Sequence, residues 1–376
     1  MKIALLSDGI YPYVVGGMQK HSYFLAKYLA RNKINVDLYH FKSIDNYNLP
    51  NPFTAEELLF IKIFEIDYPS TIWFPGHYLY KRYLYSKKIL KVFINENINY
   101  DFVYIQGFSG WSLLNNRKKN KIDSPIGLNF HGYEMFQRWP SVISGIKLQI
   151  LKYPVLYNMR KADFLFSFGG KISEIISNKV SKNKIIEILS GVEDNFISNR
   201  IKPTSQQLNF IFVGRAERRK GIIELNKVIH SLDKIYDANF HFVGPIKSNL
   251  KILDSRVTYH GSIYDSSDLK LILDQMDILL CPSYSEGLPN VIMEGMSRGL
   301  AIIATDVGAV SKLVDEENGW LINPKGLEKS LEDIIVKAIK TNPNGIDKKK
   351  KQSLNKIKFF TWEKVILQLI NRIKSE

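Results

Sequence analysis

Residues 282–299 read PSYSEGLPNVIMEGMSRG and combine a turn, the start of a helix and two carboxylates. The uncharged run before them, residues 278–281, predicts a buried strand, and the apolar spacing after it predicts a helix over residues 289–298. Gly287 permits a tight turn, and Pro289 suits the first turn of a helix. Free backbone N–H groups at a helix start attract anions. The stretch therefore predicts a phosphate-binding turn between a strand and a helix.

Two glutamates belong to this turn and its helix. Glu286 lies in the turn and Glu294 lies about one and a half turns into the helix, so both carboxylates can face one pocket from different depths. Carboxylates accept hydrogen bonds from hydroxyl groups well. The spacing leaves an equal alternative open, in which Glu286 only offsets the helix dipole and Glu294 is solvated.

The same alternation of strand and helix extends in both directions along the chain. It predicts strands at residues 2–7, 35–40, 102–106, 126–131, 164–168, 185–189, 208–213, 240–243, 257–260, 278–282, 301–305 and 320–322. It predicts helices at residues 19–31, 221–236, 268–276, 289–298, 327–338 and 362–373. The sequence thus favours an α/β protein with parallel sheets.

This pattern divides into two Rossmann-like, doubly wound domains. We expect an N-terminal domain at residues 1–200 and a C-terminal domain at 201–358, joined by the aperiodic segment 200–207. Residues 359–376 are expected to form a closing helix that packs back toward the N-terminal domain. Ligands of such sheets bind beyond the carboxyl ends of the strands, so two facing domains predict an interdomain cleft.

Length and composition agree with a folded protein of two domains. The chain has 376 residues, of which 45% are hydrophobic and 24% charged, as in ordinary globular proteins. Cys281 is the only cysteine, so neither an internal disulfide nor a cysteine-based zinc site can form. No apolar run reaches the ~18 residues of a membrane span, and the run at residues 3–6 is too short for a signal peptide. We therefore expect a cytoplasmic protein.

The net charge of +15 is unevenly distributed. Residues 1–200 hold 26 Lys and Arg against 16 Asp and Glu, whereas residues 201–376 hold 26 against 21. A basic half can attract nucleic acid, anionic lipid or a phosphorylated substrate, but no nucleic-acid-binding motif is present, so we expect no nucleic acid. Residues 78–93 predict a basic amphipathic helix that contacts an anionic membrane, or equally one that packs on the sheet.

Three further motifs follow predicted strands. Residues 212–221, FVGRAERRKG, place Arg215 and Lys220 around a glycine turn, where two cations could hold a diphosphate. The alternative is a basic cluster, including Arg218 and Arg219, that covers a surface. The glycine pair at residues 16–17 precedes the first helix and can bring bare amides to a ligand.

His131 ends a predicted strand, where a site would lie, although a lone histidine is more often structural. Several motifs are absent from the sequence. There is no G-x-G-x-x-G fingerprint, no D-x-D, no G-x-x-x-x-G-K-[ST] and no H-E-x-x-H. These absences reduce the support for a dinucleotide cofactor, a metal-held diphosphate, a P-loop and a zinc protease. We expect no cofactor and no metal.

Together these motifs resemble the retaining glycosyltransferases of family four, the group 1 nucleotide-sugar transferases of the GT-B fold. The resemblance covers most of the chain and is weakest over residues 49–120. It is carried by Gly16-Gly17, His131-Gly132, Gly214-Arg215, Lys220-Gly221, His260-Gly261, Glu286, Glu294, Gly299, Asp306-Val-Gly308 and Asn318-Gly319.

The resemblance implies a role for each matching residue. Arg215 and Lys220 would grip the donor diphosphate without a metal, Glu286 would bind the transferred sugar, and His131 would lie near its reacting carbon. Glu294 would bind the ribose and the backbone at Ile263 the base. The remaining donor contacts would come from Gly16, Gly17, Gly214, Gly287, Leu288 and Asn290. Many relatives carry an acidic residue close after the glycine pair. Here that segment begins with Met18 and Gln19, which leaves Asp8 and Gln19 as the acceptor-site candidates.

The resemblance further implies transfer of a hexose-type sugar with retention of configuration. The donor would be a UDP-sugar first and a GDP-sugar second. The acceptor would be a glycan or a lipid-linked glycan of a bacterial surface polysaccharide or glycoconjugate, at the inner face of the cytoplasmic membrane. Two alternatives remain: a nucleotide-sugar 2-epimerase of similar architecture, and a non-catalytic partner subunit that binds nucleotide or glycan.

Overall fold

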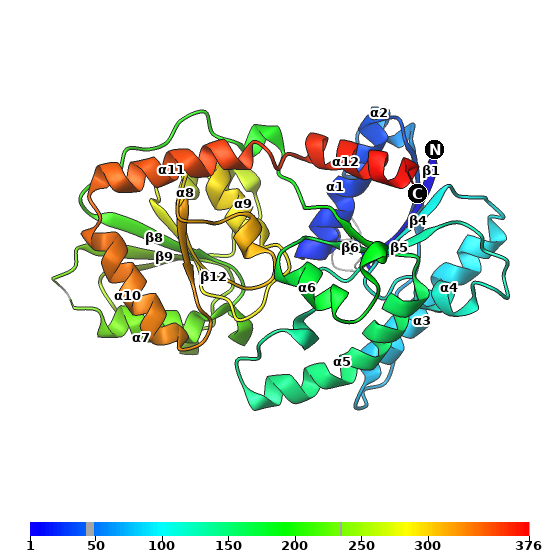
Figure 1. The fold of residues 1–376 in the computed structure, drawn as a ribbon, viewed down its shortest axis with the longest axis horizontal. Coiled ribbons are helices and arrows are strands. Elements are labelled where there is room, and N and C mark those ends of the chain that lie inside the picture. The colour runs from blue at the N-terminus through cyan, green and yellow to red at the C-terminus, as the bar shows by residue number, and fades with distance from the viewer. Residues whose placement is uncertain (43–48, 234, 376) are drawn as a thin grey trace.

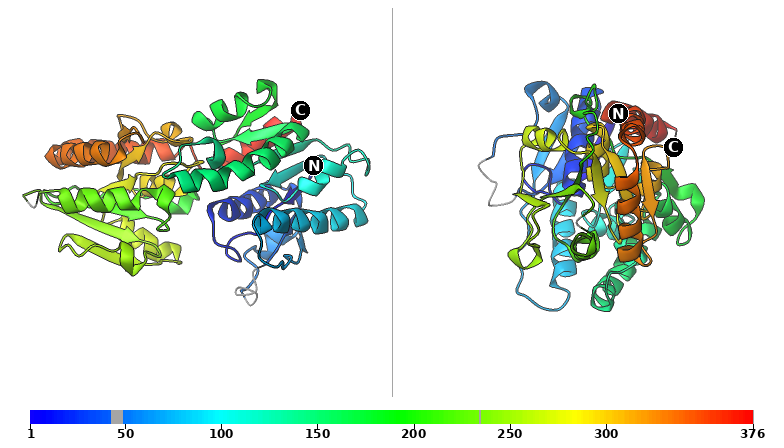
Figure 2. Two further views of the ribbon diagram at one scale, coloured as in Figure 1. Left: turned by 90° about the horizontal axis from the view of Figure 1, so that it is seen from below. Right: turned by 90° about the vertical axis from the view of Figure 1, so that its left-hand side faces the viewer.

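The computed structural model describes residues 1–42, 49–233 and 235–375, which form two α/β domains (Figure 1). Figure 2 shows the two domains end to end along the long axis of the molecule. Within the described residues the N-terminal sheet has seven strands in the order β3-β2-β1-β4-β5-β6-β7, and the C-terminal sheet has six in the order β10-β9-β8-β11-β12-β13. All the strand pairs in both sheets are parallel. Both domains are therefore doubly wound.

The N-terminal domain alternates strands with helices. Its strands are β1 (Lys2–Leu6), β2 (Asn35–His40), β3 (Ile61–Glu65), β4 (Phe102–Gln106), β5 (Ile126–Asn129), β6 (Phe164–Ser167) and β7 (Ile185–Glu187). Its helices are α1 (Gly17–Arg31), α2 (Ala55–Leu58), α3 (His77–Asn95), α4 (Trp111–Asn116), α5 (Val142–Lys161) and α6 (Lys171–Ser177). The central strands β1 and β4 are buried at nearly every position, as parallel strands covered on both faces must be.

The C-terminal domain repeats the arrangement. Its strands are β8 (Leu208–Val213), β9 (Ala238–Val243), β10 (Val257–Gly261), β11 (Ile278–Cys281), β12 (Ala301–Thr305) and β13 (Gly319–Ile322). The helices of this half are α7 (Ile222–Ser231), α8 (Ser266–Leu273), α9 (Asn290–Ser297), α10 (Leu327–Lys340), α11 (Pro343–Ile357) and α12 (Trp362–Lys374). The expected strands of both domains are present, with their ends displaced by a few residues at most.

The last helix, α12, packs on the N-terminal domain (Figure 1). Trp362 is buried and stacks on Phe24 and Tyr28 of α1, with ring centroids 5.5 and 6.1 Å away. Each fully buried large apolar side chain contributes about 1.5–3 kcal/mol. The chain thus crosses between the domains twice, and the two crossings meet in a bridge between Val192 and Thr361.

Several helix boundaries differ from those expected, and three of them have a local explanation. The helix expected at residues 221–236 ends at Ser231, because Leu232 adopts an extended backbone and turns its side chain into the core. Pro289 is the extended residue before α9 and not its first helical residue. α8 begins at Ser266, where the Asp265 carboxylate accepts a hydrogen bond from the Ser267 amide.

Candidate active site

The carboxyl ends of the two sheets face each other, and most of the expected site residues lie on the loops between them (Figure 1). β1 and β4 are neighbours in their sheet but not in the sequence, and so are β8 and β11. Such switch points are where doubly wound sheets bind ligands. Contacts across the junction join the domains. For example, Lys171 of α6 pairs with Asp306 at 2.8 Å.

Glu286 lies at the centre of this junction and is buried between cations. The Lys220 ammonium lies 2.6 Å from one carboxylate oxygen, and the Arg219 guanidinium lies 3.5 Å from the other. Burial alone raises the pKa of the Glu286 carboxyl, but the charges of Lys220 and Arg219 outweigh burial and hold the pKa below its ordinary value. Glu286 is therefore a carboxylate at neutral pH.

A glycine lets Lys220 approach this carboxylate. Lys220 ends a 3₁₀ turn, Arg218–Lys220, and Gly221 follows with a left-handed φ of 73°. A methyl group at Gly221 would lie 2.0 Å from the carbonyl oxygen of Pro282, so only glycine allows the turn to pack on the loop after β11. The two segments are joined by a hydrogen bond from the Tyr284 amide to the Arg219 carbonyl.

The arginines of this turn have different partners. Arg215 is 64% exposed at the rim, and its guanidinium pairs with Glu217 at 3.0 Å. Arg218 points away from Glu286 and pairs with Glu224 of α7. Arg219, which the sequence analysis considered only as part of a basic surface cluster, lies beside the Glu286 carboxylate. The sequence signal for it was only its place beside Lys220.

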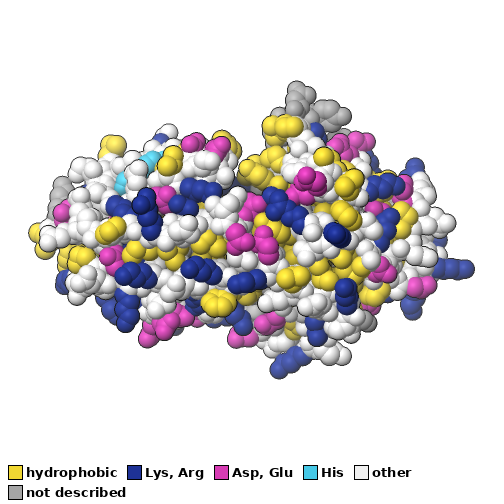
Figure 3. All heavy atoms as spheres, turned by 90° about the horizontal axis from the view of Figure 1, so that it is seen from above, with side chains coloured by type: hydrophobic (Ala, Val, Ile, Leu, Met, Phe, Trp, Pro, Cys, Tyr) yellow, Lys and Arg dark blue, Asp and Glu magenta, His cyan; other side chains and the backbone are white. Residues whose placement is uncertain are grey.

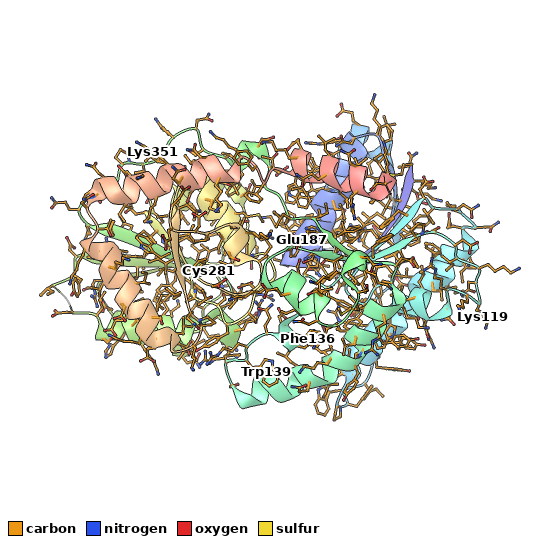
Figure 4. All side chains as sticks on the ribbon, viewed as in Figure 1. Lys119, Phe136, Trp139, Glu187, Cys281 and Lys351 are labelled. Atoms are coloured by element: carbon orange, nitrogen blue, oxygen red, sulfur yellow. The ribbon has the colours of Figure 1, made fainter. Side chains whose placement is uncertain are left out.

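The start of α9 packs closely on the N-terminal domain. A methyl group at Gly287 would lie 2.9 Å from the carbonyl oxygen of His131, so a glycine is needed for this approach. Gln137 binds the same loop: its amide donates to the Glu286 carbonyl at 2.6 Å and accepts from the Glu286 amide at 3.3 Å. Figure 4 labels Phe136 and Trp139, which flank Gln137 on the segment between β5 and α5. Sequence analysis missed Gln137, because nothing local marks a glutamine as an interdomain ligand.

His131 occupies a left-handed backbone conformation (φ 62°) directly after β5. Its amide donates to the Asn129 side chain at 2.8 Å, and its Nε2 lies 2.6 Å from the Gln106 side-chain oxygen. Burial, and then the neighbouring His21, keep the pKa of His131 well below its ordinary value. His131 is therefore a neutral imidazole that donates from Nε2 to Gln106.

The glycine pair faces the start of α9. Gly16 precedes α1, and Gly17 is the first helical residue. The position that a side chain of Gly17 would take lies 3.9 Å from the Asn290 side-chain amide. One turn further along α1, Lys20 pairs with Glu294 at 2.5 Å. Glu294 is thus already engaged by the opposite domain.

The acceptor-site candidates lie together at the end of β1. Gln19 donates to Asp8 at 3.0 Å, and Arg82 of α3 pairs with the other Asp8 oxygen at 2.7 Å. Arg82 was not expected here, because it lies in the part of the sequence with the weakest resemblance. Among the other donor candidates, Leu288 is buried after Glu286 and Gly287, Ile263 is half-buried after β10, and Gly214 follows β8.

Within residues 1–42, 49–233 and 235–375, no group of three or more His, Cys, Asp or Glu side chains is placed to hold a metal ion. Metal-free chemistry stays a prediction. In the same ranges no helix is long and apolar enough to cross a membrane.

Residues 207–341, most of the C-terminal domain, match the family model described as glycosyl transferases group 1. Over this range the chain is similar to the group 1 glycosyltransferases. A putative teichuronic acid biosynthesis glycosyltransferase of Bacillus subtilis is 38% identical over 132 residues, which cover 35% of this chain and 33% of the relative. An uncharacterized glycosyltransferase of Methanocaldococcus jannaschii is 26% identical over 392 residues, which cover 98% of this chain and 96% of the relative.

Solved structures of glycosyltransferases share the fold of the chain along its whole length. Sucrose-phosphate synthase from Thermosynechococcus elongatus has a TM-score of 0.79 at 18% identity, covering 100% of this chain and 98% of that one. An Anabaena protein, HepE, in complex with UDP and glucose has a TM-score of 0.66 at 16% identity, covering 100% of both chains. At these identities the likeness establishes the GT-B fold.

Proposed function

We propose that the protein transfers a hexose-type sugar from a nucleoside diphosphate sugar to a glycan or a lipid-linked glycan. The product would belong to a bacterial surface polysaccharide or glycoconjugate, as the name of the Bacillus relative suggests. The observation that carries the proposal is the buried Glu286 carboxylate held by Lys220 and Arg219 at the junction of the sheets.

The donor binds between the two domains. Lys220 and Arg215 hold the diphosphate, and the amides of Leu288 and Asn290 at the start of α9 add donors of fixed direction. Glu286 accepts hydrogen bonds from the sugar hydroxyls, Glu294 from the ribose, and the base lies at the backbone of Ile263. UDP is the first candidate, because the structurally similar Anabaena protein holds UDP and glucose, and GDP is the second.

The reaction breaks the bond between the anomeric carbon and the β-phosphate oxygen, and the electron pair leaves with the phosphate. Lys220 and Arg215 stabilise the developing negative charge without a metal, because their positive charges offset that of the departing phosphate. The acceptor hydroxyl attacks the same face of the sugar and gives its proton to the departing phosphate, so configuration is retained. Neutral His131 lies close to the sugar and contributes position, not charge.

The test is nucleotide release and sugar transfer from UDP- and GDP-hexoses in EDTA, with NMR to identify the anomer formed. Lys220→Met and Glu286→Gln should abolish most turnover. Lys227→Met is the matched control, because Lys227 lies on α7 two turns away, is 60% exposed and pairs with Glu328. Inversion at the anomeric carbon would overturn the retaining mechanism, and unchanged turnover in Lys220→Met would overturn the site.

We further propose that α3 and the loop before it dock on an anionic membrane at the cytoplasmic side. Ile72 and Trp73 are 89% and 75% exposed, and lysines 87, 88 and 91 are exposed on α3. Exposed aromatic residues beside a basic helix suit an anionic lipid surface. Arg82 of the same helix pairs with Asp8, one of the acceptor-site candidates. Docking of α3 would therefore bring a lipid-linked acceptor close to these candidates.

Co-sedimentation with phosphatidylcholine vesicles, with and without phosphatidylglycerol, tests this docking. Binding should require the anionic lipid and be lost in Trp73→Ser/Lys87→Glu. The control, Lys348→Glu/Lys351→Glu, changes exposed lysines of α11, which Figure 4 places at the far end of the molecule from α3. Figure 3 shows basic side chains over both domains. A general charge effect would weaken binding at least as much in the control, which loses more positive charge, and would refute the surface.

A further inference from the structure

Lys20 and Glu294 form an ion pair that crosses the domain junction. The ammonium of Lys20, on α1, lies 2.5 Å from a carboxylate oxygen of Glu294, on α9. The Glu294 side chain is 11% exposed and the Lys20 side chain 37%. Burial alone lowers the pKa of Lys20, but Glu294 outweighs burial and raises the pKa above its ordinary value. Lys20 therefore stays charged at neutral pH.

The pair lies on the side of α9 that faces the glycine loop. Gly17 approaches Asn290 at the start of α9, and one turn further along each helix Lys20 meets Glu294. The first turns of α1 and α9 therefore lie side by side. These are the helix starts to which the proposed function assigns donor binding. An ammonium group has three N–H donors, and only one is needed for Glu294. The Lys20 side chain is 37% exposed, so Glu294 and its neighbours do not enclose it completely.

Lys20 is one of several basic side chains that form ion pairs around Glu286 and Glu294. The basic residues are Arg215, Arg219, Lys220 and Lys20, and the acidic ones are Glu217, Glu134, Glu286 and Glu294. A nucleoside diphosphate brings further negative charge to this set, so the loss of one cation weakens its attraction to the site.

We propose that Lys20 is a donor-binding residue supplied by the N-terminal domain, whose ammonium bridges Glu294 and the donor diphosphate. This inference rests on the proposed function and adds to it a cation from the domain otherwise assigned to the acceptor. Glu294 holds Lys20 in position before the donor arrives. Donor binding then engages both domains at once, because the diphosphate contacts Lys220 on one side and Lys20 on the other.

The experiment is calorimetric titration of the full chain and of Lys20→Met with UDP and with uridine, or with GDP and guanosine if GDP is the nucleotide that binds. Lys20→Met should weaken diphosphate binding about 10-fold, the effect of one hydrogen bond to a charged group, and leave nucleoside binding unchanged. Lys20→Arg should restore most of the diphosphate affinity. The control is Lys27→Met, because Lys27 lies on the same helix and pairs with Glu193 at 2.7 Å, away from the donor contacts.

Each other outcome overturns the inference. Equal weakening of diphosphate and nucleoside would mean that Lys20 only supports Glu294 and the domain contact. Unchanged or tighter diphosphate binding would mean that Lys20 adds nothing to the donor or competes with it. If the unchanged protein binds neither UDP nor GDP, the proposed function fails and this inference fails with it, so the two failures can be told apart.

Discussion

The two sides of the candidate site are built in different ways. On the C-terminal side the functional groups come from two short segments, the turn at residues 214–221 and the turn and first helical residues at 286–294, each of which follows a strand. On the N-terminal side Lys20 comes from α1, and His131 and Gln137 come from the segment between β5 and α5, so the two segments meet only through the fold. Donor recognition is thus local in the sequence, whereas the surface that closes on the donor is a product of tertiary structure.

The largest expected effect lies on the C-terminal side. Lys220→Met should lower transfer by about 10²–10³-fold, the usual cost of losing one charge-stabilising group, while the circular dichroism spectrum stays unchanged. Comparison of kcat and KM with the Lys227→Met control measures it. Loss confined to KM would show that Lys220 binds the donor but does not stabilise the departing phosphate.

The second prediction concerns acid stability on the N-terminal side. Burial lowers the pKa of His21 to about 3, whereas the unfolded chain protonates histidine near pH 6.5. The stability due to neutral His21 is therefore complete above pH 6.5 and is lost as the pH falls from there toward 3, by up to about 1.4 kcal/mol per unit. In His21→Gln the melting temperature should fall less between pH 6.5 and pH 4 than in the wild type. An equally steep fall in the variant would assign the acid sensitivity to other groups.

The smallest expected effect tests the contact between the sides. Gln137→Ala removes the two hydrogen bonds to the Glu286 backbone, and we expect about a 10-fold loss of kcat/KM with little change in melting temperature. Gln137→Glu keeps the side-chain acceptor oxygen but loses the N–H donor. Its kcat/KM should lie between those of the wild type and Gln137→Ala. A full loss of activity in Gln137→Ala would place Gln137 among the essential residues.

The same contrast explains which features could be predicted from the sequence. Most strands of both sheets were predictable, because buried parallel strands are short continuous apolar runs. The prediction missed β3, which is a partly exposed edge strand. Glu286, Lys220 and the glycine turns were marked by their place between strand and helix. α11 was missed because it is rich in lysine, and Lys350 is buried only because Asp277, far away in the sequence, neutralises it at 2.9 Å.

The interdomain residues lay beyond the reach of sequence reasoning. Gln137 and Lys20 have no periodicity or spacing that sets them apart, and Arg219 looked like one member of a basic run. Their partners are Glu286 and Glu294, more than a hundred residues away in the first two cases, so only the folded chain identifies them.

The central claim is that the junction binds a nucleoside diphosphate through Lys220 and Arg215 without a metal. Calorimetric titration with UDP, GDP and ADP in EDTA, repeated with magnesium, tests it most directly. The account predicts that one nucleotide binds in EDTA with a Kd of roughly micromolar order and that magnesium changes little. Binding of none of the three under either condition, or binding only with magnesium, would contradict it.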